Sequence, residues 1–192
     1  MRSASMRSNP TNEELARIPN LDSLSLSGNA AIQNLEPLLN VPRLKSLRID
    51  GTSVMDLSPL RGQRLITQLD ISNTRISNIE VVGNFSKLNT LRANGAAIAD
   101  LNALANVGAI RRIYADRTSL ADSAVRNFLH KQPSCLVVFK TDTLKRWWND
   151  LPESWRDVFN EQVKITEGNE SEDLHRLVEG ESIRFRDASV SN

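Results

Sequence analysis

The sequence is poor in cysteine, histidine and aromatic residues, and these shortages limit what the chain can be. Cys135 is the only cysteine among 192 residues, so no disulfide can form within the chain. No apolar run approaches the roughly 18–20 residues that a membrane-spanning helix needs. The N-terminal stretch MRSASMRSNP has arginines but lacks the apolar centre of a signal peptide. We therefore expect a cytoplasmic location.

Motifs of familiar catalytic chemistry are also missing. Neither His130 nor His175 has a Cys, His or Asp cluster nearby with the spacing of a zinc site. The sequence contains no P-loop, no dinucleotide-binding glycine pattern and no G-x-S-x-G motif. Cys135 begins an apolar segment without a neighbouring base, which favours a buried, inert thiol. We expect no enzyme activity, no metal and no cofactor, unless a catalytic domain lies outside this sequence.

Excess charge of one sign is missing as well. The formal net charge is +1, which argues against general nucleic-acid binding. Hydrophobic residues make up 40% of the chain and charged residues 24%, as is ordinary for a globular protein. Composition alone therefore indicates a folded domain and no particular ligand.

What the sequence does contain is a 22-residue repeat. Three consecutive copies begin at Leu44, Ile66 and Leu88. A 23-residue copy from Leu21 precedes them, and a longer copy from Ile110 follows. The five copies share two apolar positions, Leu24, Leu47, Leu69, Leu91 and Ile113 at one, and Leu26, Ile49, Ile71, Ala93 and Ala115 at the other. A fixed period of about 20–29 residues indicates a solenoid of stacked units.

Each copy has a readable local structure. The L-x-x-L-x-L segment alternates apolar and polar residues at its end, as a short strand does. Gly51, Asn73 and Gly95 follow it and permit a tight turn. The threonine after the turn, as in Thr52, is expected to donate its hydroxyl to a backbone carbonyl. The next apolar residues step by three, which suits a 3₁₀ helix on the outer side.

These features resemble the leucine-rich repeat family, and within it the bacterial internalin-like class with 22-residue repeats. The motif TSVMDLSPL at residues 52–60 is especially similar, and the resemblance covers residues 21 to about 134. It implies an α/β solenoid with a curved parallel sheet on the concave side and 3₁₀ or short helices on the convex side. Ala93, Ala96 and Ala115 depart from the pattern, and their small side chains are expected to reduce the apolar core of the fourth and fifth copies.

The segments around the repeats predict two caps. We expect disorder over residues 1–10, then an N-terminal cap helix over 11–20 that begins with the capping box Thr11–Glu14. The repeat domain spans 21–139, with about five repeats, a helix over 123–133 in the last of them and a closing strand over 135–139. This strand would end the sheet.

The remaining residues change in character. Residues 140–164 form a Trp-rich helical segment that Pro152 divides in two. Its tryptophans either pack this small helical module or form an aromatic partner site. Residues 165–192 read as an acidic linker and the possible truncated start of a second repeat array, because Leu174, Ile183 and Phe185 match Leu15, Leu24 and Leu26. Chance alignment of a short leucine pattern is the alternative.

The outward residues of the strands are the candidate site. The repeat register places eight of interest on the concave face: Arg48, Asp50, Asp70, Arg92, Asn94, Arg112, Tyr114 and Asp116. They either pair with one another and keep the sheet soluble, or contact a protein partner through arginine and tyrosine. We predict a non-catalytic protein–protein interaction module of bacterial type. The alternative is a rigid spacer within a larger multidomain protein.

Overall fold

The computed structural model describes residues 3–5 and 20–157. The chain divides into two compact units, Met1–Phe139 and Lys140–Asn192. The first unit contains the repeats and is described first. Residues 11–19 of the predicted cap helix over 11–20, and the whole of 165–192, lie outside the described residues.

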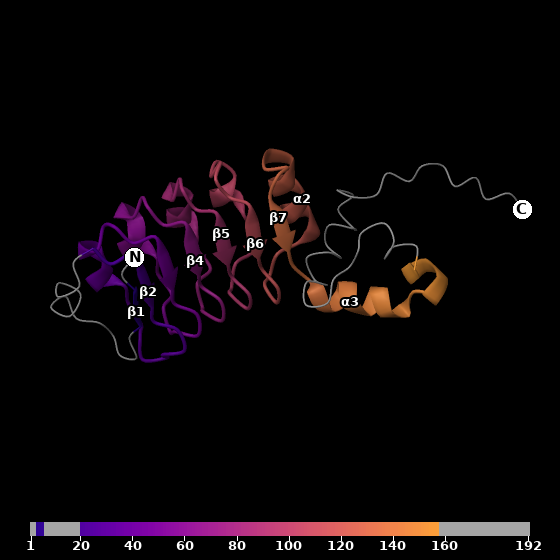
Figure 1. The fold of residues 1–192 in the computed structure, drawn as a ribbon, viewed down its shortest axis with the longest axis horizontal. Coiled ribbons are helices and arrows are strands. Elements are labelled where there is room, and N and C mark those ends of the chain that lie inside the picture. The colour runs from indigo at the N-terminus through magenta and orange to yellow at the C-terminus, as the bar shows by residue number, and fades with distance from the viewer. Residues whose placement is uncertain (1–2, 6–19, 158–192) are drawn as a thin grey trace, which may run out of the picture. The chain divides into compact units, whose positions relative to one another are not determined.

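One parallel sheet runs through the first unit, with its strands in the order in which they occur in the sequence. Each strand of the described chain is three residues long, and neighbours in the sequence are neighbours in the sheet (Figure 1). The strands are β1 Ser3–Ser5, β2 Ser23–Ser25, β3 Ser46–Arg48, β4 Gln68–Asp70, β5 Thr90–Arg92, β6 Arg112–Tyr114 and β7 Leu136–Val138. The predicted parallel sheet with one strand per repeat is confirmed.

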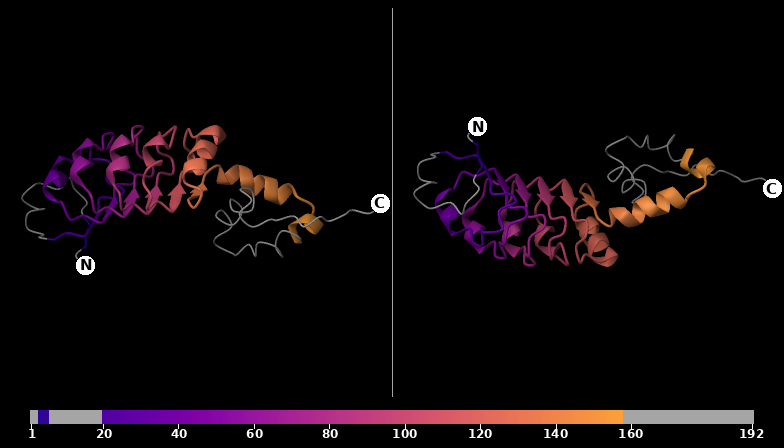
Figure 2. Two further views of the ribbon diagram at one scale, coloured as in Figure 1. Left: turned by 90° about the horizontal axis from the view of Figure 1, so that it is seen from above. Right: turned by 90° about the horizontal axis from the view of Figure 1, so that it is seen from below.

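Short helices occupy the other side of the repeats, so that strands and helices form two opposite layers (Figure 2). Four are 3₁₀ helices and the last is an α-helix: η1 Glu36–Asn40, η2 Ser58–Gly62, η3 Glu80–Asn84, η4 Asn102–Leu104 and α2 Asp122–Lys131. The 3₁₀ helices confirm the reading of apolar residues that step by three. A side-chain acceptor precedes each of them and takes a backbone N–H two residues on: Asn34, Asp56, Asn78 and Asp100.

The core lies between the two layers and continues from repeat to repeat. The central residue of every strand from β2 to β7 is buried and stands in register with its neighbours: Leu24, Leu47, Leu69, Leu91, Ile113 and Val137. Ala93 and Ala115 are buried at the second of the two shared apolar positions, despite their small size. The predicted core positions are confirmed, and no single repeat could have covered these leucines by itself.

The turns after the strands have the conformation that the sequence predicts. Gly51 and Gly95 adopt φ of 67° and 69°, and Asn73 adopts φ of 53°. Glycine and asparagine tolerate this left-handed region better than other residues. Arg117 occupies the same place in the next repeat with φ of 54°, although its side chain disfavours that conformation.

The threonines that follow the turns bond as expected. The hydroxyls of Thr52, Thr74 and Thr118 donate to the carbonyls of Ile49, Ile71 and Ala115 at 2.7, 2.6 and 2.7 Å. Thr52 and Thr74 are buried, so these bonds satisfy carbonyl oxygens that water cannot reach. The fourth repeat has Ala96 at this position and lacks the bond.

The N-terminus differs from the prediction of disorder over residues 1–10, because Ser3–Ser5 form strand β1. This strand pairs with β2 in parallel, with Ala4 opposite Leu24. The edge of β2 presents unpaired backbone groups that any extended segment can use. Ala4 packs against the core at this edge, although a single alanine between serines carries no recognisable strand signal.

The second unit begins with helix α3, Thr141–Asp150. Pro152 separates it from a further helical segment that is described over residues 153–157. The carbonyl of Pro152 accepts the N–H groups of Trp155 and Arg156, so the proline stands at the start of that segment, as predicted. Trp147 and Trp155 are exposed by 39% and 53%. No helix of the described residues is long and apolar enough to cross a membrane.

Candidate functional site

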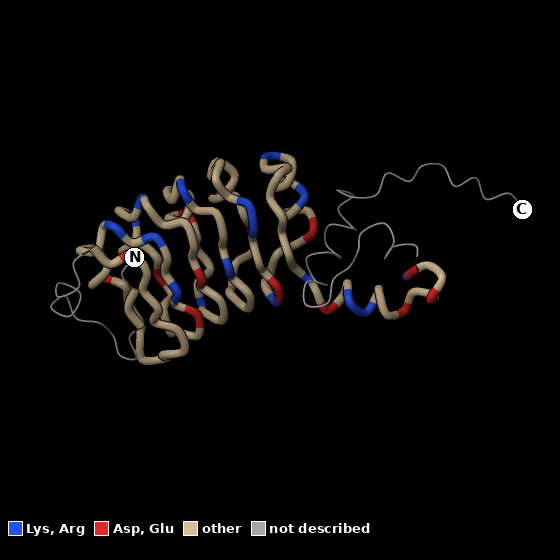
Figure 3. The backbone as a smooth tube through the Cα atoms, in the orientation of Figure 1, with Lys and Arg blue, Asp and Glu red and all other residues tan. Residues whose placement is uncertain are grey.

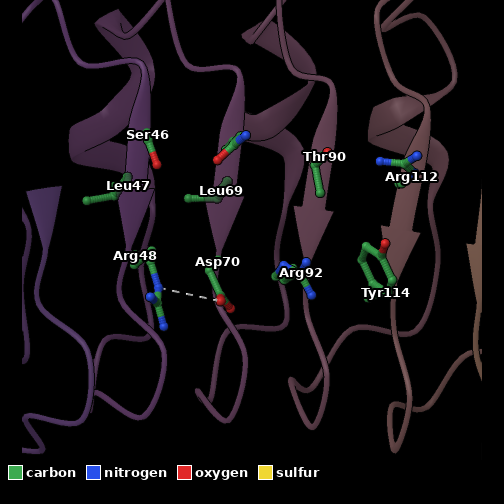
Figure 4. A pocket seen from close by; sticks show the side chains of 10 residues that line it. Ser46, Leu47, Arg48, Leu69, Asp70, Thr90, Arg92, Arg112 and Tyr114 are labelled. Carbon is green, nitrogen blue, oxygen red and sulfur yellow. Dashed lines mark ion pairs between the residues drawn. The ribbon is translucent and has the colours of Figure 1, made fainter. Parts of the chain in front are cut away.

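The outward surface of strands β3 to β6, which we call the sheet face, is hollowed into a groove of about 520 Å³. The groove lies on the side of the sheet away from the 3₁₀ helices, and its lining side chains come from four adjacent strands (Figure 4). They are Ser46, Leu47, Arg48, Gln68, Leu69, Asp70, Thr90, Arg92, Arg112 and Tyr114. Five of the eight predicted site residues are therefore brought together here.

The middle row of the groove contains Arg48, Asp70, Arg92 and Tyr114, which the strand pairing places in register. Arg48 interacts with two carboxylates. Its Nε lies 3.5 Å from Asp50 Oδ1 and 4.0 Å from Asp70 Oδ2. The side chain of Arg48 is 57% exposed, so each pair is screened by water and contributes little stability. At this end the residues of the face pair with one another.

Arg92 behaves differently, although it is also adjacent to Asp70 in the sheet. Its guanidinium Cζ lies 4.4 Å from the centre of the Tyr114 ring, so the cation stacks on the aromatic face (Figure 4). Such a contact contributes about 0.5–1 kcal/mol at an exposed site. Among the described residues, no carboxylate lies within ion-pair distance of Arg92 or Arg112. The mutual pairing that the sequence left open is therefore present between Arg48 and Asp70, whereas no ion pair joins Asp70 to Arg92 on the next strand.

The three predicted residues that follow the strands lie beside the groove and not in its lining. Asp50 accepts a hydrogen bond from the Ser27 hydroxyl at 2.5 Å. Asn94 Oδ1 accepts the backbone N–H of Asp116 at 2.9 Å. Asp50 and Asn94 thus connect one repeat to the next, which is a structural task whether or not they also contact a partner.

Three polar residues, Ser46, Gln68 and Thr90, line the groove without being among the eight candidates. The repeat register places them in the outward row before the central leucine, so their position was readable from the sequence. Their short or neutral side chains carried no signal of function, which is why charge and aromatic character did not single them out.

Other chemistry is not evident in the part of the chain that the structure describes. No group of three or more His, Cys, Asp or Glu side chains is placed to hold a metal ion among residues 3–5 and 20–157. Cys135 is buried, as expected of an inert thiol. Residues of both charge signs are spread along the backbone of the repeats (Figure 3).

The architecture matches solved leucine-rich repeat structures. An internalin, inlF, from Listeria monocytogenes aligns with 70% of this chain at a TM-score of 0.63 and 25% identity. Internalin C2 from the same species aligns with 62% at a TM-score of 0.54 and 23% identity. A leucine-rich repeat protein from Leptospira interrogans aligns with 68% at a TM-score of 0.61 and 16% identity. These three structural neighbours of the repeat domain are leucine-rich repeat proteins of bacteria.

The alignments cover only part of the neighbours. The matched region is 40% of the inlF chain, 62% of the internalin C2 chain and 34% of the Leptospira chain. No family model matches the sequence, and no curated protein is significantly similar to it. The fold is therefore established as a leucine-rich repeat solenoid, a fold that is typically a protein-interaction module and generally non-catalytic.

Proposed function

We propose that this leucine-rich repeat solenoid binds a protein partner through its sheet face and catalyses no reaction. The observation that carries the proposal is the groove across β3 to β6. It gathers the only tyrosine of the chain with Arg92 and Arg112, neither of which has a carboxylate within ion-pair distance among the described residues. Arginine and tyrosine are enriched among the residues that dominate binding energy at protein interfaces.

The chemistry of the face supports this proposal. Polar and charged side chains form most of the lining of the groove. Enzyme and cofactor sites are in contrast mostly apolar and concave, with a few convergent polar groups. The backbone of the face is held by the sheet, so a partner meets prearranged side chains and loses less conformational entropy on binding.

The test is a binding experiment with substitutions on the two layers. The full chain would be used to capture and cross-link its protein partner. Three forms of the chain would be compared: the natural sequence, Arg48→Ala/Arg92→Ala, and Arg61→Ala on η2. We expect the double substitution to abolish capture and Arg61→Ala to retain it, since Arg61 is exposed on the helical side. Far-UV circular dichroism would verify that all three proteins fold alike.

A rigid spacer remains the second candidate, and one observation favours it. The contacts of Arg48 with Asp50 and Asp70 show that charged residues of the face pair with one another, and one of the two pairs joins adjacent repeats. Under this alternative the double substitution lowers stability slightly and leaves capture unchanged. Unchanged capture therefore contradicts the binding proposal.

A further inference from the structure

We propose that the part of the sheet face formed by β5 and β6 binds an acidic segment of the protein partner. Arg92, Arg112 and Tyr114 are the residues that would contact it. This inference rests on the proposed function, because it assumes that the partner binds at the sheet face, and it adds the chemical class of what is bound.

The arginines of the face are not equivalent. The two carboxylates beside Arg48, from Asp50 and Asp70, compensate its charge within the face. Asp70 stands opposite Arg92 in the register but makes no ion pair with it, and no other described carboxylate lies within ion-pair distance of Arg92 or Arg112. A carboxylate that arrives from outside must therefore displace ion-paired acids at Arg48, whereas it displaces no existing ion pair at Arg92 and Arg112.

The backbone register brings the contact residues together. Arg92 stands opposite Tyr114, and Arg112 stands two residues before Tyr114 on the same strand, opposite Thr90. Adjacent strands are about 4.8 Å apart and two residues along a strand span about 6.6 Å, so the two arginines start roughly 8 Å from each other. Flexible arginine side chains at that separation can reach either one carboxylate together or two carboxylates of a short segment.

The tyrosine prepares one of the two cations for binding. The Tyr114 ring lies under the Arg92 guanidinium at 4.4 Å and limits the directions in which that side chain points. A side chain that is already ordered loses less entropy when it binds. The edge of a planar guanidinium remains available for two parallel hydrogen bonds to a carboxylate.

The surroundings favour a protein segment over a nucleic acid. A polynucleotide gains affinity from many phosphate contacts along its length and needs a continuous row of cations. Here two acidic residues interrupt the row of arginines. Asp70 stands opposite Arg92 on the neighbouring strand, and Asp116 follows Tyr114 by two residues in the sequence. A short acidic segment can place its few carboxylates over the arginines alone, whereas a phosphate chain would also cross these acids.

The test uses short random peptides displayed on phage and selected on the immobilised full chain. We expect the selected peptides to be rich in Asp and Glu. The affinity of a synthetic copy of one of them should fall by about tenfold or more in Arg92→Ala/Arg112→Ala. The loss should be smaller in Arg48→Ala and absent in Arg61→Ala, and circular dichroism would verify the fold of each variant.

The other outcomes separate this inference from the proposed function. Peptides without acidic residues that lose affinity in Tyr114→Ala would overturn the acidic specificity and keep the sheet face as the binding surface. Peptides that bind every sheet-face variant equally would overturn both proposals. A random single-stranded oligonucleotide that binds more tightly than the peptides, through Arg92 and Arg112, would overturn the assignment to an acidic protein segment.

Discussion

Replacing Leu69 by alanine is the strongest test of the core, because Leu69 lies in β4 with repeats on both sides. Its side chain is 2% exposed. The substitution removes three carbon atoms, and at about 0.8 kcal/mol for each buried CH₂ the transfer term is roughly 2.5 kcal/mol. In register with it, Leu47 and Leu91 are fully buried in strands that the sheet holds apart, so the space cannot close completely. With the residual cavity, the expected loss of unfolding free energy is about 3–4 kcal/mol.

A loss of this size is large for a small domain, whose total stability is typically about 5–15 kcal/mol. Neighbouring repeats stabilise one another, so a defect in the central strand weakens two interfaces and not one. We expect one transition with a lower midpoint and an unchanged slope against urea. A broader or divided transition would show that the repeats on the two sides of β4 unfold separately.

The assay should follow far-UV circular dichroism during urea unfolding. Tryptophan fluorescence would report on residues 147, 148 and 155, which lie in the second unit and not in the repeats. The matched control is Leu39→Ala, the same chemical change at a leucine of η1 that is 62% exposed. We expect the control to change stability by less than about 0.5 kcal/mol. Equal effects of the two substitutions, or a loss below about 1 kcal/mol at Leu69, would refute the assignment of Leu69 to the core.

Three further predictions concern the turns. Thr74→Val removes the 2.6 Å hydrogen bond that the threonine hydroxyl donates to the buried Ile71 carbonyl. The unfolding free energy measured with urea should fall by about 1–3 kcal/mol. An unchanged unfolding free energy would contradict the structural role of that bond. Gly95→Ala should destabilise the protein by about 1–2 kcal/mol, because φ is +69° and the new Cβ would lie 2.7 Å from Asn73 Oδ1. The control is Gly62→Ala, where the new Cβ meets no atom within 4 Å. Similar melting temperatures for the two variants would contradict the strain expected at Gly95. The pKa of Asp56 lies below its usual 3.8, first because of its side-chain hydrogen bond with Ser58, so this carboxylate contributes stability above that pH and loses it as the pH falls through the folded pKa. An NMR titration that gives a normal or raised pKa for Asp56 would disprove this.

Much of the fold was predictable because the repeat encodes each element locally and then stacks it. The spacing of leucines selected the buried residues, and Gly51, Asn73 and Gly95 marked the left-handed turns. Thr52 and Thr74 marked the carbonyls that needed a donor. Each of these features depends on a few consecutive residues and on the 22-residue period. An ambiguous prediction in one copy can therefore be checked against the same position in the other copies.

The candidate site was predictable in position only. The register placed Arg48, Asp70, Arg92 and Tyr114 in one row, and the strand pairing confirms that row. The pairing of their charges did not follow from the order of signs. Arg48 contacts carboxylates, whereas Arg92 stacks on Tyr114. Which neighbour an arginine contacts depends on rotamers and on competing side chains from adjacent repeats, and a linear pattern does not contain that information.

The sequence by itself determined the solenoid, its core and the row of outward residues, because these follow from periodicity and from residue types that need particular backbone conformations. Only the tertiary structure decided that Ser3–Ser5 add a strand at the edge of β2 and that Arg92 and Arg112 make no ion pair with a carboxylate among the described residues. The physical reason is the same in both cases. The pairing of β1 with β2 and the contact of Arg92 with Tyr114 both join residues that are about 20 positions apart in the sequence. Such residues meet only after the repeats have stacked.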